Sequence, residues 1–204
     1  RRQRQMCIRD RNKTMKIALG TSNPHKLEEI KEIIKNSNIE FVLPAGGFDP
    51  VENGKTFEEN SYIKAAEASK ISGLWGLADD TGLCVDALDG APGLYSARYA
   101  PTAQERIEKL LEELKGVPEE KRTAKFVCTM VLTNPAGEKF HVQTGEIKGR
   151  ITEKPSGTYG FGYDPVFFIP ELGKTMAEMT LEEKNTLSHR ARALLPMVEF
   201  IESM

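Results

Sequence analysis

The sequence has few of the residues that mark disulfide frameworks, metal centres and membrane spans. It contains three cysteines in 204 residues, with no Cys-x-x-Cys pair, and its three histidines stand far apart. This spacing excludes the usual zinc-site patterns. Cys84 and Cys128 stand in apolar runs, so we expect small buried thiols of a reducing compartment. No apolar run approaches the length of a membrane span, and we therefore expect no transmembrane helix and no membrane partner.

Charge is distributed unevenly along the chain. Residues 1–14 contain five Arg, one Lys and one Asp, a net charge of +5, which leaves -7 for residues 15–204 within the total of -2. Residues 1–14 have no apolar periodicity, whereas Met15 runs directly into a strand pattern. We therefore interpret residues 1–14 as an upstream or artificially added extension and residues 15–204 as a single domain. The acidic body argues against a nucleic-acid partner.

The segment 75–83 is an apolar run that ends in two adjacent carboxylates, Asp79 and Asp80, followed by Thr81 and Gly82. This pattern predicts a buried strand whose end delivers acidic groups to an open turn. Because side chains alternate along a strand, the two carboxylates should point to opposite faces unless the chain bends between them. Taken alone, an ordinary Asp-Thr-Gly turn explains the segment better than a functional site does.

A turn rich in hydrogen-bond donors lies between a predicted strand, residues 16–20, and a predicted helix, residues 26–36. The N–H groups of a first helical turn can hold an anion. A Walker A loop is excluded, because His25 stands where its second glycine belongs and Leu27 where its Ser or Thr belongs. A plain helix cap with a solvated Lys26 remains as compatible with this turn as phosphate binding.

The next helix is predicted from Thr56 to about Ser72, with a capping box between Thr56 and Glu59. Lys64 lies on this helix and can reach a phosphate, although a surface lysine is the ordinary explanation. Glu52 lies in the preceding loop and has no structural role that the sequence explains, although most loop carboxylates are simply solvated.

The C-terminal third contains a loop of glycines and aromatic residues, 157–165, before a predicted strand at 166–169. Its glycines precede a strand, so a dinucleotide-binding fold is excluded. Such a loop either lets a planar ring stack on Phe161 or is a tight connection between strands. A second capping box at Thr180 opens a final helical segment, which Pro196 should kink or split. His189 and Arg190 in that segment are either a recognition pair or solvated basic residues.

Strands and helices alternate early, and segments 124–133 and 138–144 flank a turn typical of a hairpin, with a further short strand at 146–153. We therefore expect an α/β fold with a mixed sheet, flanking helices and two lobes around a central cleft.

Six motifs, read together, stand in the order found in one enzyme family. They are Thr21–Lys26, Gly54–Asn60, Ala78–Leu83, Gly90–Tyr99, Phe161–Pro165 and Ser188–Arg190. From Met15 to about Ile201, the chain resembles the inosine triphosphate pyrophosphatases. The resemblance implies a long, curved sheet, a cytoplasmic homodimer, and hydrolysis of dITP, ITP and XTP to the monophosphate and pyrophosphate. Such an activity keeps abnormal bases out of DNA and RNA.

The resemblance also implies a role for each motif. Asp80 matches the catalytic carboxylate that binds Mg²⁺, with Mn²⁺ as an alternative, and accepts a proton; Glu52 or Asp79 would be a second metal ligand. The residues implied to hold the triphosphate are Thr21, Ser22, Asn23, Pro24, His25, Lys26, Lys64 and Thr81. Those implied to contact the base and sugar are Phe161, Gly162, Tyr163, Asp164, Lys184, His189 and Arg190.

These roles agree with the chemistry of triphosphate hydrolysis. A hard cation and lysines can neutralise a pyrophosphate leaving group while a carboxylate orients a water toward the α-phosphorus. Donors from His189 and Arg190 would meet the 6-oxygen of hypoxanthine and xanthine and leave adenine facing unpaired groups. Two rival hypotheses are a related pyrophosphatase acting on modified or pyrimidine nucleotides and a non-enzymatic nucleotide-binding regulator.

Overall fold

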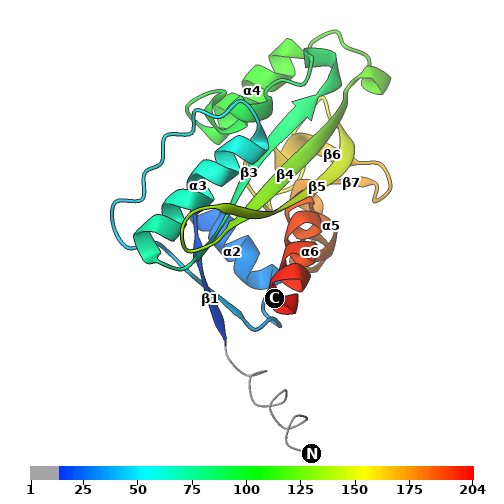
Figure 1. Ribbon diagram of the computed structural model, residues 1–204. Helices are drawn as coiled ribbons and strands as arrows, with labels where there is room; N and C mark the ends of the chain where they lie inside the picture. The colour runs from blue at the N-terminus through cyan, green and yellow to red at the C-terminus, as the bar shows by residue number, and fades with distance from the viewer. Residues whose placement is uncertain (1–13) are drawn as a thin grey trace, which may run out of the picture.

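The computed structural model describes residues 14–204, so the interpretation of residues 1–14 and the position of Cys7 concern a segment almost wholly outside the described residues (Figure 1). The described residues form one seven-stranded sheet in the order β2-β1-β3-β4-β5-β6-β7. The strands are β1 (Met15–Leu19), β2 (Ile39–Val42), β3 (Trp75–Val85), β4 (Thr123–Thr133), β5 (Lys139–Ile151), β6 (Phe167–Ile169) and β7 (Lys174–Thr175).

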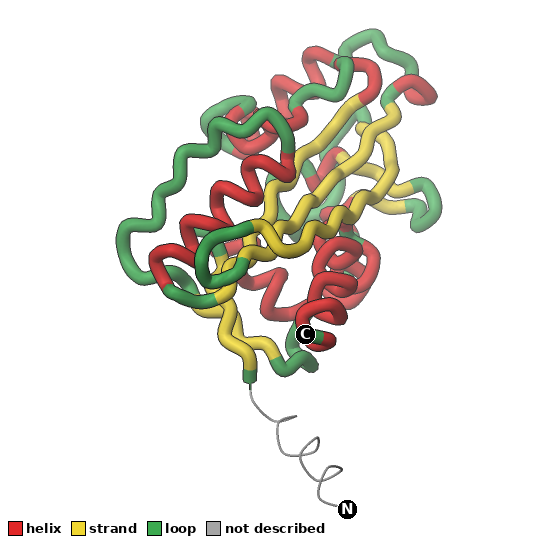
Figure 2. Tube along the Cα trace, viewed as in Figure 1, coloured by secondary structure: helices red, strands yellow, loops and turns green. Residues whose placement is uncertain are grey.

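The helices flank this sheet on both sides (Figure 2). They are α2 (Pro24–Ile33), α3 (Phe57–Ser72), α4 (Ala103–Glu113), α5 (Leu181–Leu187) and α6 (His189–Ser203). Short 3₁₀ helices are η1 (Asp86–Leu88), η2 (Gly93–Arg98), η3 (Glu119–Lys121), η4 (Asp164–Val166) and η5 (Met176–Glu178). Among the described residues, no helix combines the length and the apolar character that a membrane crossing requires.

The sheet is mixed, as expected. β1 pairs in parallel with β2 and β3, and every later pairing is antiparallel. The predicted hairpin is confirmed in β4 and β5, but the separate short strand expected at 146–153 is wrong, because β5 continues without a break to Ile151. The neighbouring strand β4 offers N–H and C=O groups along its whole length, and a longer β5 forms hydrogen bonds with more of them.

The prediction that β3 ends at the acidic pair is also wrong. β3 runs through Asp79 and Asp80 to Val85 because β4 pairs with it from Gly76 to Val85. The predicted alternation is confirmed: the two carboxylates have different partners on opposite faces of the strand. β1 pairs with only the first residues of β3, as far as Leu77, so the remaining edge of β3 is free of β1.

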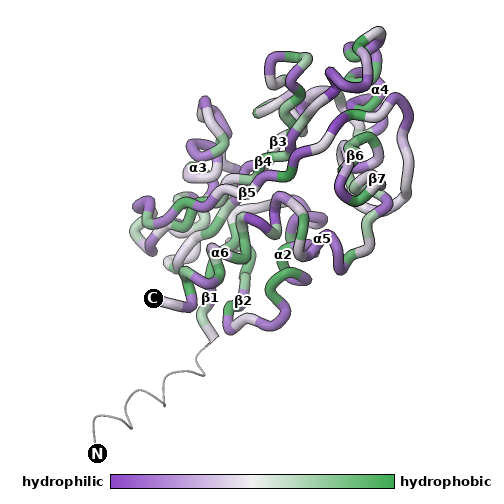
Figure 3. The backbone as a smooth tube through the Cα atoms, turned by 90° about the vertical axis from the view of Figure 1, so that its right-hand side faces the viewer, coloured by the Kyte–Doolittle hydropathy of each residue, from purple (hydrophilic) through white to green (hydrophobic). Residues whose placement is uncertain are grey.

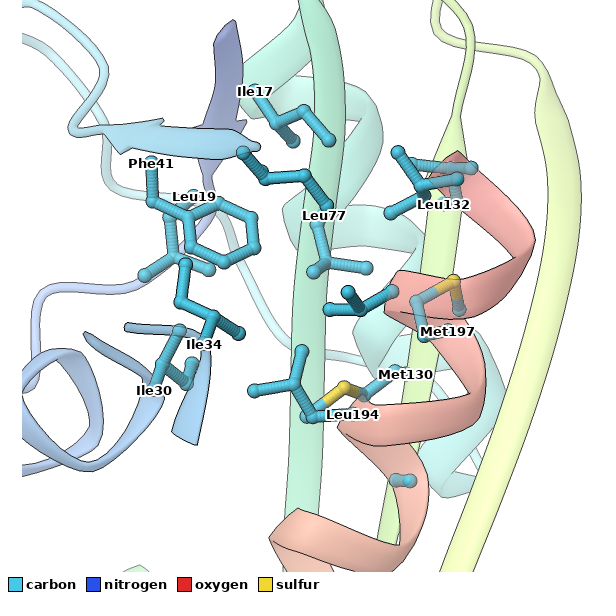
Figure 4. Packing of buried hydrophobic residues seen from close by; sticks show 14 of the residues in the cluster. Ile17, Leu19, Ile30, Ile34, Phe41, Leu77, Met130, Leu132, Leu194 and Met197 are labelled. Carbon is cyan, nitrogen blue, oxygen red and sulfur yellow. The ribbon is translucent and has the colours of Figure 1, made fainter. Parts of the chain in front are cut away.

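Two hydrophobic cores divide the molecule into the expected lobes. One core lies between α2, α6 and the sheet, where Leu194 and Met197 meet Leu77 and Met130 (Figure 4). The other gathers around Leu110 of α4 and the far halves of β3, β4 and β5. The most hydrophobic stretches of the chain lie in strands and in the helices beside them (Figure 3). Cys128 is buried as expected, whereas Cys84 is only half-buried.

Local signals set most helix ends. Thr180 forms the predicted capping box with Glu183. At Thr56 only half of the box is correct: the hydroxyl accepts the Glu59 N–H at 3.1 Å, but the Glu59 carboxylate accepts the N–H of Lys55 instead of that of Thr56.

The final segment does split, but at Ser188 and not at Pro196. Ser188 has an extended ψ of 157° and its hydroxyl caps α6. Pro196 stays inside α6 because it lies on the exposed side, where the carbonyl that it leaves unpaired can meet water.

Candidate active site

A cleft of about 370 Å³ opens where β1 stops and β3 continues. Ligand sites of open α/β sheets lie at such carboxyl ends of strands. The cleft brings together most of the predicted site residues: Thr21, Ser22, Asn23, Lys26, Glu52, Lys64, Asp80, Thr81, Phe161, Gly162, Tyr163, Asp164, Lys184, His189 and Arg190. Of the predicted residues, Pro24, His25 and Asp79 stand outside its lining.

Lys64 draws two carboxylates together on one wall. Its Nζ lies 2.9 Å from Glu52 Oε2 and 3.3 Å from Asp80 Oδ1, and the residue is 7% exposed. Burial lowers the pKa of Lys64, but Asp80, Asp79 and Glu52 outweigh burial and raise the pKa above its usual value, so the ammonium stays charged. The ordinary expectation of a solvated surface lysine is therefore wrong.

Neighbouring groups hold the Asp80 carboxylate in place, but they do not offset the effect of burial on its pKa. Its second oxygen accepts an amide N–H of Asn60 at 3.2 Å. Burial raises the pKa of Asp80 and outweighs the opposing effects of Lys64, Lys26 and the Asn60 hydrogen bond. A carboxylate with a raised pKa takes up a proton more readily, which suits a general base.

Asp79 lies on the other face of β3 and is 2% exposed. Its Oδ2 is 3.0 Å from Lys26 Nζ and 3.5 Å from an Arg190 nitrogen, and it accepts the Thr81 hydroxyl at 2.7 Å. Burial raises the pKa of Asp79, but Lys26 and Arg190 overcome burial and hold the pKa far below its usual range. Asp79 therefore remains an anion that ties together groups from the two ends of the cleft.

These positions separate Asp79 from the other predicted metal ligands. Glu52 and Asp80 share Lys64, whereas Asp79 is engaged on the opposite face. Within residues 14–204, no three His, Cys, Asp or Glu side chains gather closely enough to hold a metal ion between them. Glu52 and Asp80 are therefore the two carboxylates that a metal ion in this part of the cleft could meet together.

The donor-rich turn forms the N-terminus of α2. Asn23 Oδ1 accepts the His25 N–H at 3.0 Å, so the expected helix cap is present, with Pro24 at the first helical position. Thr21 Oγ1 accepts the Asn23 N–H at 3.1 Å, and Ser22 is exposed beside it. Lys26 is not solvated, because it pairs with Asp79 in the floor of the cleft.

The glycine and aromatic loop forms the opposite end. The Asp164 carboxylate accepts the Phe161 N–H at 3.1 Å and lies 2.7 Å from Lys184 Nζ. Burial raises the pKa of Asp164 against the effect of Lys184. Gly162 adopts a φ of 64°, which favours glycine at this bend. Tyr163 is a core residue, whose hydroxyl donates to the Ser96 carbonyl at 2.8 Å.

His189 and Arg190 are both buried, so the alternative of solvated basic residues is wrong. The His189 ring stacks on Phe126 with centroids 4.8 Å apart. Burial, Arg190 and Lys184 hold the pKa of His189 well below its usual value, so the imidazole is neutral. Arg190 Nε and His189 Nδ1 are buried and have no hydrogen-bond partner among residues 14–204.

Sequence reasoning missed Glu29, which lines the cleft. Its carboxylate contacts Arg190 closely and lies 3.2 Å from Lys184 Nζ. Glu29 stands three residues after Lys26 on α2, and residues at that spacing share a helix face. The spacing from Lys26 was the only sign in the sequence that Glu29 could face the cleft. This sign is weak, because the sequence contains many other acidic residues with similar spacing.

Comparisons with known proteins show which family the chain resembles in sequence and in structure. Residues 17–200 match the model of the Ham1 family. A Clostridium perfringens (strain 13 / Type A) protein named dITP/XTP pyrophosphatase is 50% identical over 191 residues, covering 88% of this chain and 93% of its own. A protein of the same name from Listeria monocytogenes serovar 1/2a (strain ATCC BAA-679 / EGD-e) is 46% identical over 200 residues, covering 93% and 98%. The solved structure of a HAM1 protein from Coxiella burnetii superposes with a TM-score of 0.85 at 38% identity, covering 93% of this chain and 100% of its own.

Proposed function

This chain belongs to the Ham1 family, and from that premise we propose that it hydrolyses dITP, ITP and XTP to the monophosphate and pyrophosphate. The chain is a nucleoside-triphosphate pyrophosphatase, as its relatives named dITP/XTP pyrophosphatase are. Its role is to remove non-standard purine nucleotides before a polymerase can use them.

One observation carries the proposal. Two carboxylates, Glu52 and Asp80, converge on the Lys64 ammonium, and the N-terminus of α2 with Lys26 lies in the same cleft. Carboxylates that already surround one cation suit Mg²⁺, with Mn²⁺ as an alternative. When bound, such an ion supplies positive charge for the phosphate oxygens. We assign Glu52 and Asp80 as its protein ligands, and Asp79 as the residue that holds Lys26 and Arg190 in place.

Asp80 accepts the proton of the water that attacks the α-phosphorus, because it lines the cleft with a raised pKa beside Glu52 and Lys64, whereas Asp164 is paired with Lys184 at the other end. Lys26, Lys64 and the Thr21–Asn23 turn at the N-terminus of α2 hold the triphosphate in line with that water. The pyrophosphate leaves toward Lys26, whose ammonium offsets the charge that the leaving group develops.

The base lies between Phe161 and the α5–α6 junction. The Arg190 guanidinium donates to the 6-oxygen of hypoxanthine or xanthine. Adenine offers an amine at that position and leaves the donor unpaired, which costs about 1–3 kcal/mol for a buried group. Lys184 donates to the Asp164 carboxylate, which in turn accepts the Phe161 N–H. Lys184 thereby helps to hold the loop that carries Phe161.

The proposal also includes the quaternary structure and location expected from the resemblance: residues 15–204 fold as one domain, two copies form a homodimer, and the enzyme works in the cytoplasm. Light scattering on the purified protein measures the association directly. A mass of one chain would remove the dimer from the proposal and leave the chemistry untouched.

Product analysis with Mg²⁺ and dITP, XTP, dGTP and dATP tests the function, with Asp80→Asn as the paired variant. We expect monophosphate and pyrophosphate from dITP and XTP, and a loss of about 10²–10⁴-fold in kcat for a folded Asp80→Asn. Diphosphate with phosphate would exclude attack at the α-phosphorus. Equal turnover of all four nucleotides would exclude the base assignment. A second panel of pyrimidine and modified nucleotides tests the related pyrophosphatase, which turnover confined to that panel would favour. Absence of any turnover would leave a nucleotide-binding regulator.

A further inference from the structure

His25 and Phe161 were expected in different parts of the site, but the structure places their rings together. Their centroids lie 5.3 Å apart and their planes differ by 18°, which is a stacked pair. His25 comes from the N-terminus of α2 and Phe161 from the loop 157–165, so the contact joins the triphosphate turn to the base loop.

The His25 imidazole stacks on Phe161 from outside the lining of the cleft. Phe161 lines the cleft and His25 does not, and His25 is exposed. Lys184 Nζ and the Arg190 guanidinium carbon, which do line the cleft, lie 5.7 and 5.9 Å from the centre of the Phe161 ring. Both cations lie over this ring, so a base that enters the cleft to stack on Phe161 would meet them.

The hydrophobic cores do not orient the Phe161 ring. Phe161 belongs neither to the hydrophobic core clusters nor to the side chains that pack against them. Asp164 fixes its backbone N–H but leaves the ring free to turn. The backbone at His25 is anchored, because Asn23 accepts the His25 N–H at 3.0 Å and the neighbouring Lys26 pairs with buried Asp79.

We propose that His25 is a positioning residue for base recognition: its imidazole backs the Phe161 ring and fixes it as the wall on which hypoxanthine or xanthine stacks. The proposal rests on the proposed function, because it concerns the base of that substrate. It assigns His25 to the base side and not to the phosphates. The contact also links the two ends of the site, because His25 belongs to the turn that we assign to the triphosphate and Phe161 to the loop that we assign to the base.

The test compares His25→Ala, His25→Phe and His25→Gln with wild type. We expect His25→Ala to raise KM for dITP about two- to tenfold, the effect of losing one exposed aromatic pair. kcat should stay within about twofold, because the reacting groups are untouched. His25→Phe restores the wild-type KM because it keeps a ring, and His25→Gln, which keeps a polar group without a ring, does not. Lys31→Ala, exposed on the same helix, is the control.

Two partial ligands separate the base end from the phosphate end. Calorimetry should show weaker binding of deoxyinosine to His25→Ala and unchanged binding of inorganic triphosphate. The reverse result, or rescue by Gln and not by Phe, would mean that His25 contacts phosphate, and would overturn the proposal. Failure of wild type to bind deoxyinosine would overturn it as well. Failure to hydrolyse dITP with deoxyinosine still bound would overturn the proposed function alone.

Discussion

Arg190, to which we assign base recognition, is almost completely buried, with 1% exposed. Removing one partner of a buried ion pair is strongly destabilising, because a charge is left without compensation. Two carboxylates from different elements compensate Arg190: Glu29 from α2 and Asp79 from β3. Glu29 also contacts Lys184, so this residue neutralises both cations at the base end.

Replacing Glu29 with Gln removes that charge and keeps the side-chain volume. We expect the free energy of unfolding to fall by about 1–3 kcal/mol, the range for a hydrogen bond to a charged group. KM for dITP should rise, because Arg190 and Lys184 are held less firmly. Urea denaturation and steady-state kinetics measure the two effects. Glu28→Gln, exposed at the preceding position, is the matched control, and equal losses in both variants would contradict a specific role for Glu29.

At the scale of elements, β3 shows what the sequence could and could not predict. Alternation along a strand correctly placed Asp79 and Asp80 on opposite faces. The end of the strand was predicted wrongly because Asp-Thr-Gly is locally a turn signal, whereas pairing with β4, about fifty residues away, holds the segment extended. The placement of Lys64 was unpredictable for the same reason: a lysine pattern favours the surface, and only the folded chain brings Glu52 and Asp80 to it.

The close approach of η2 to β3 predicts a steric limit at Gly82. A Cβ there would overlap the Gly93 carbonyl oxygen and lie 2.7 Å from the Phe57 ring. Gly82→Ala should therefore lower the free energy of unfolding by about 1–3 kcal/mol, as overpacking does. Gly46→Ala meets open space, so we expect it to be neutral or to stabilise by up to about 1 kcal/mol. The urea midpoints of the two variants measure the difference. A Gly82→Ala variant as stable as wild type would mean that η2 lies further from β3 than the structure shows.

At the scale of the whole molecule, the two cores leave a cleft whose fixed charges nearly cancel. The cations Lys26, Lys64, Lys184 and Arg190 each pair with carboxylates. The order of six motifs was enough to predict that these groups share one site. It could not predict how they pair, because the pairings join residues from separate elements and depend on which face each element presents.

This charge balance predicts how Mg²⁺ affects the stability of the protein. In wild type, Lys64 already compensates Glu52 and Asp80, so Mg²⁺ without nucleotide should stabilise the protein little. In Lys64→Met the two carboxylates lose that compensation, and their affinity for Mg²⁺ should rise. Binding at about 100 times Kd adds about 2.7 kcal/mol, and about 1 kcal/mol shifts Tm by about 2–4 °C in a domain near this size.

Thermal unfolding with and without Mg²⁺ therefore measures which residues meet the ion. We expect Lys64→Met to be less stable than wild type without Mg²⁺ and to gain about 5–11 °C when Mg²⁺ is added at about 100 times Kd. Adding Glu52→Gln to Lys64→Met should remove most of that gain. Lys70→Met, exposed on the same helix α3, should behave as wild type. A gain that survives Glu52→Gln would mean that Glu52 is not a ligand, and would return Asp79 to consideration as the second acidic group.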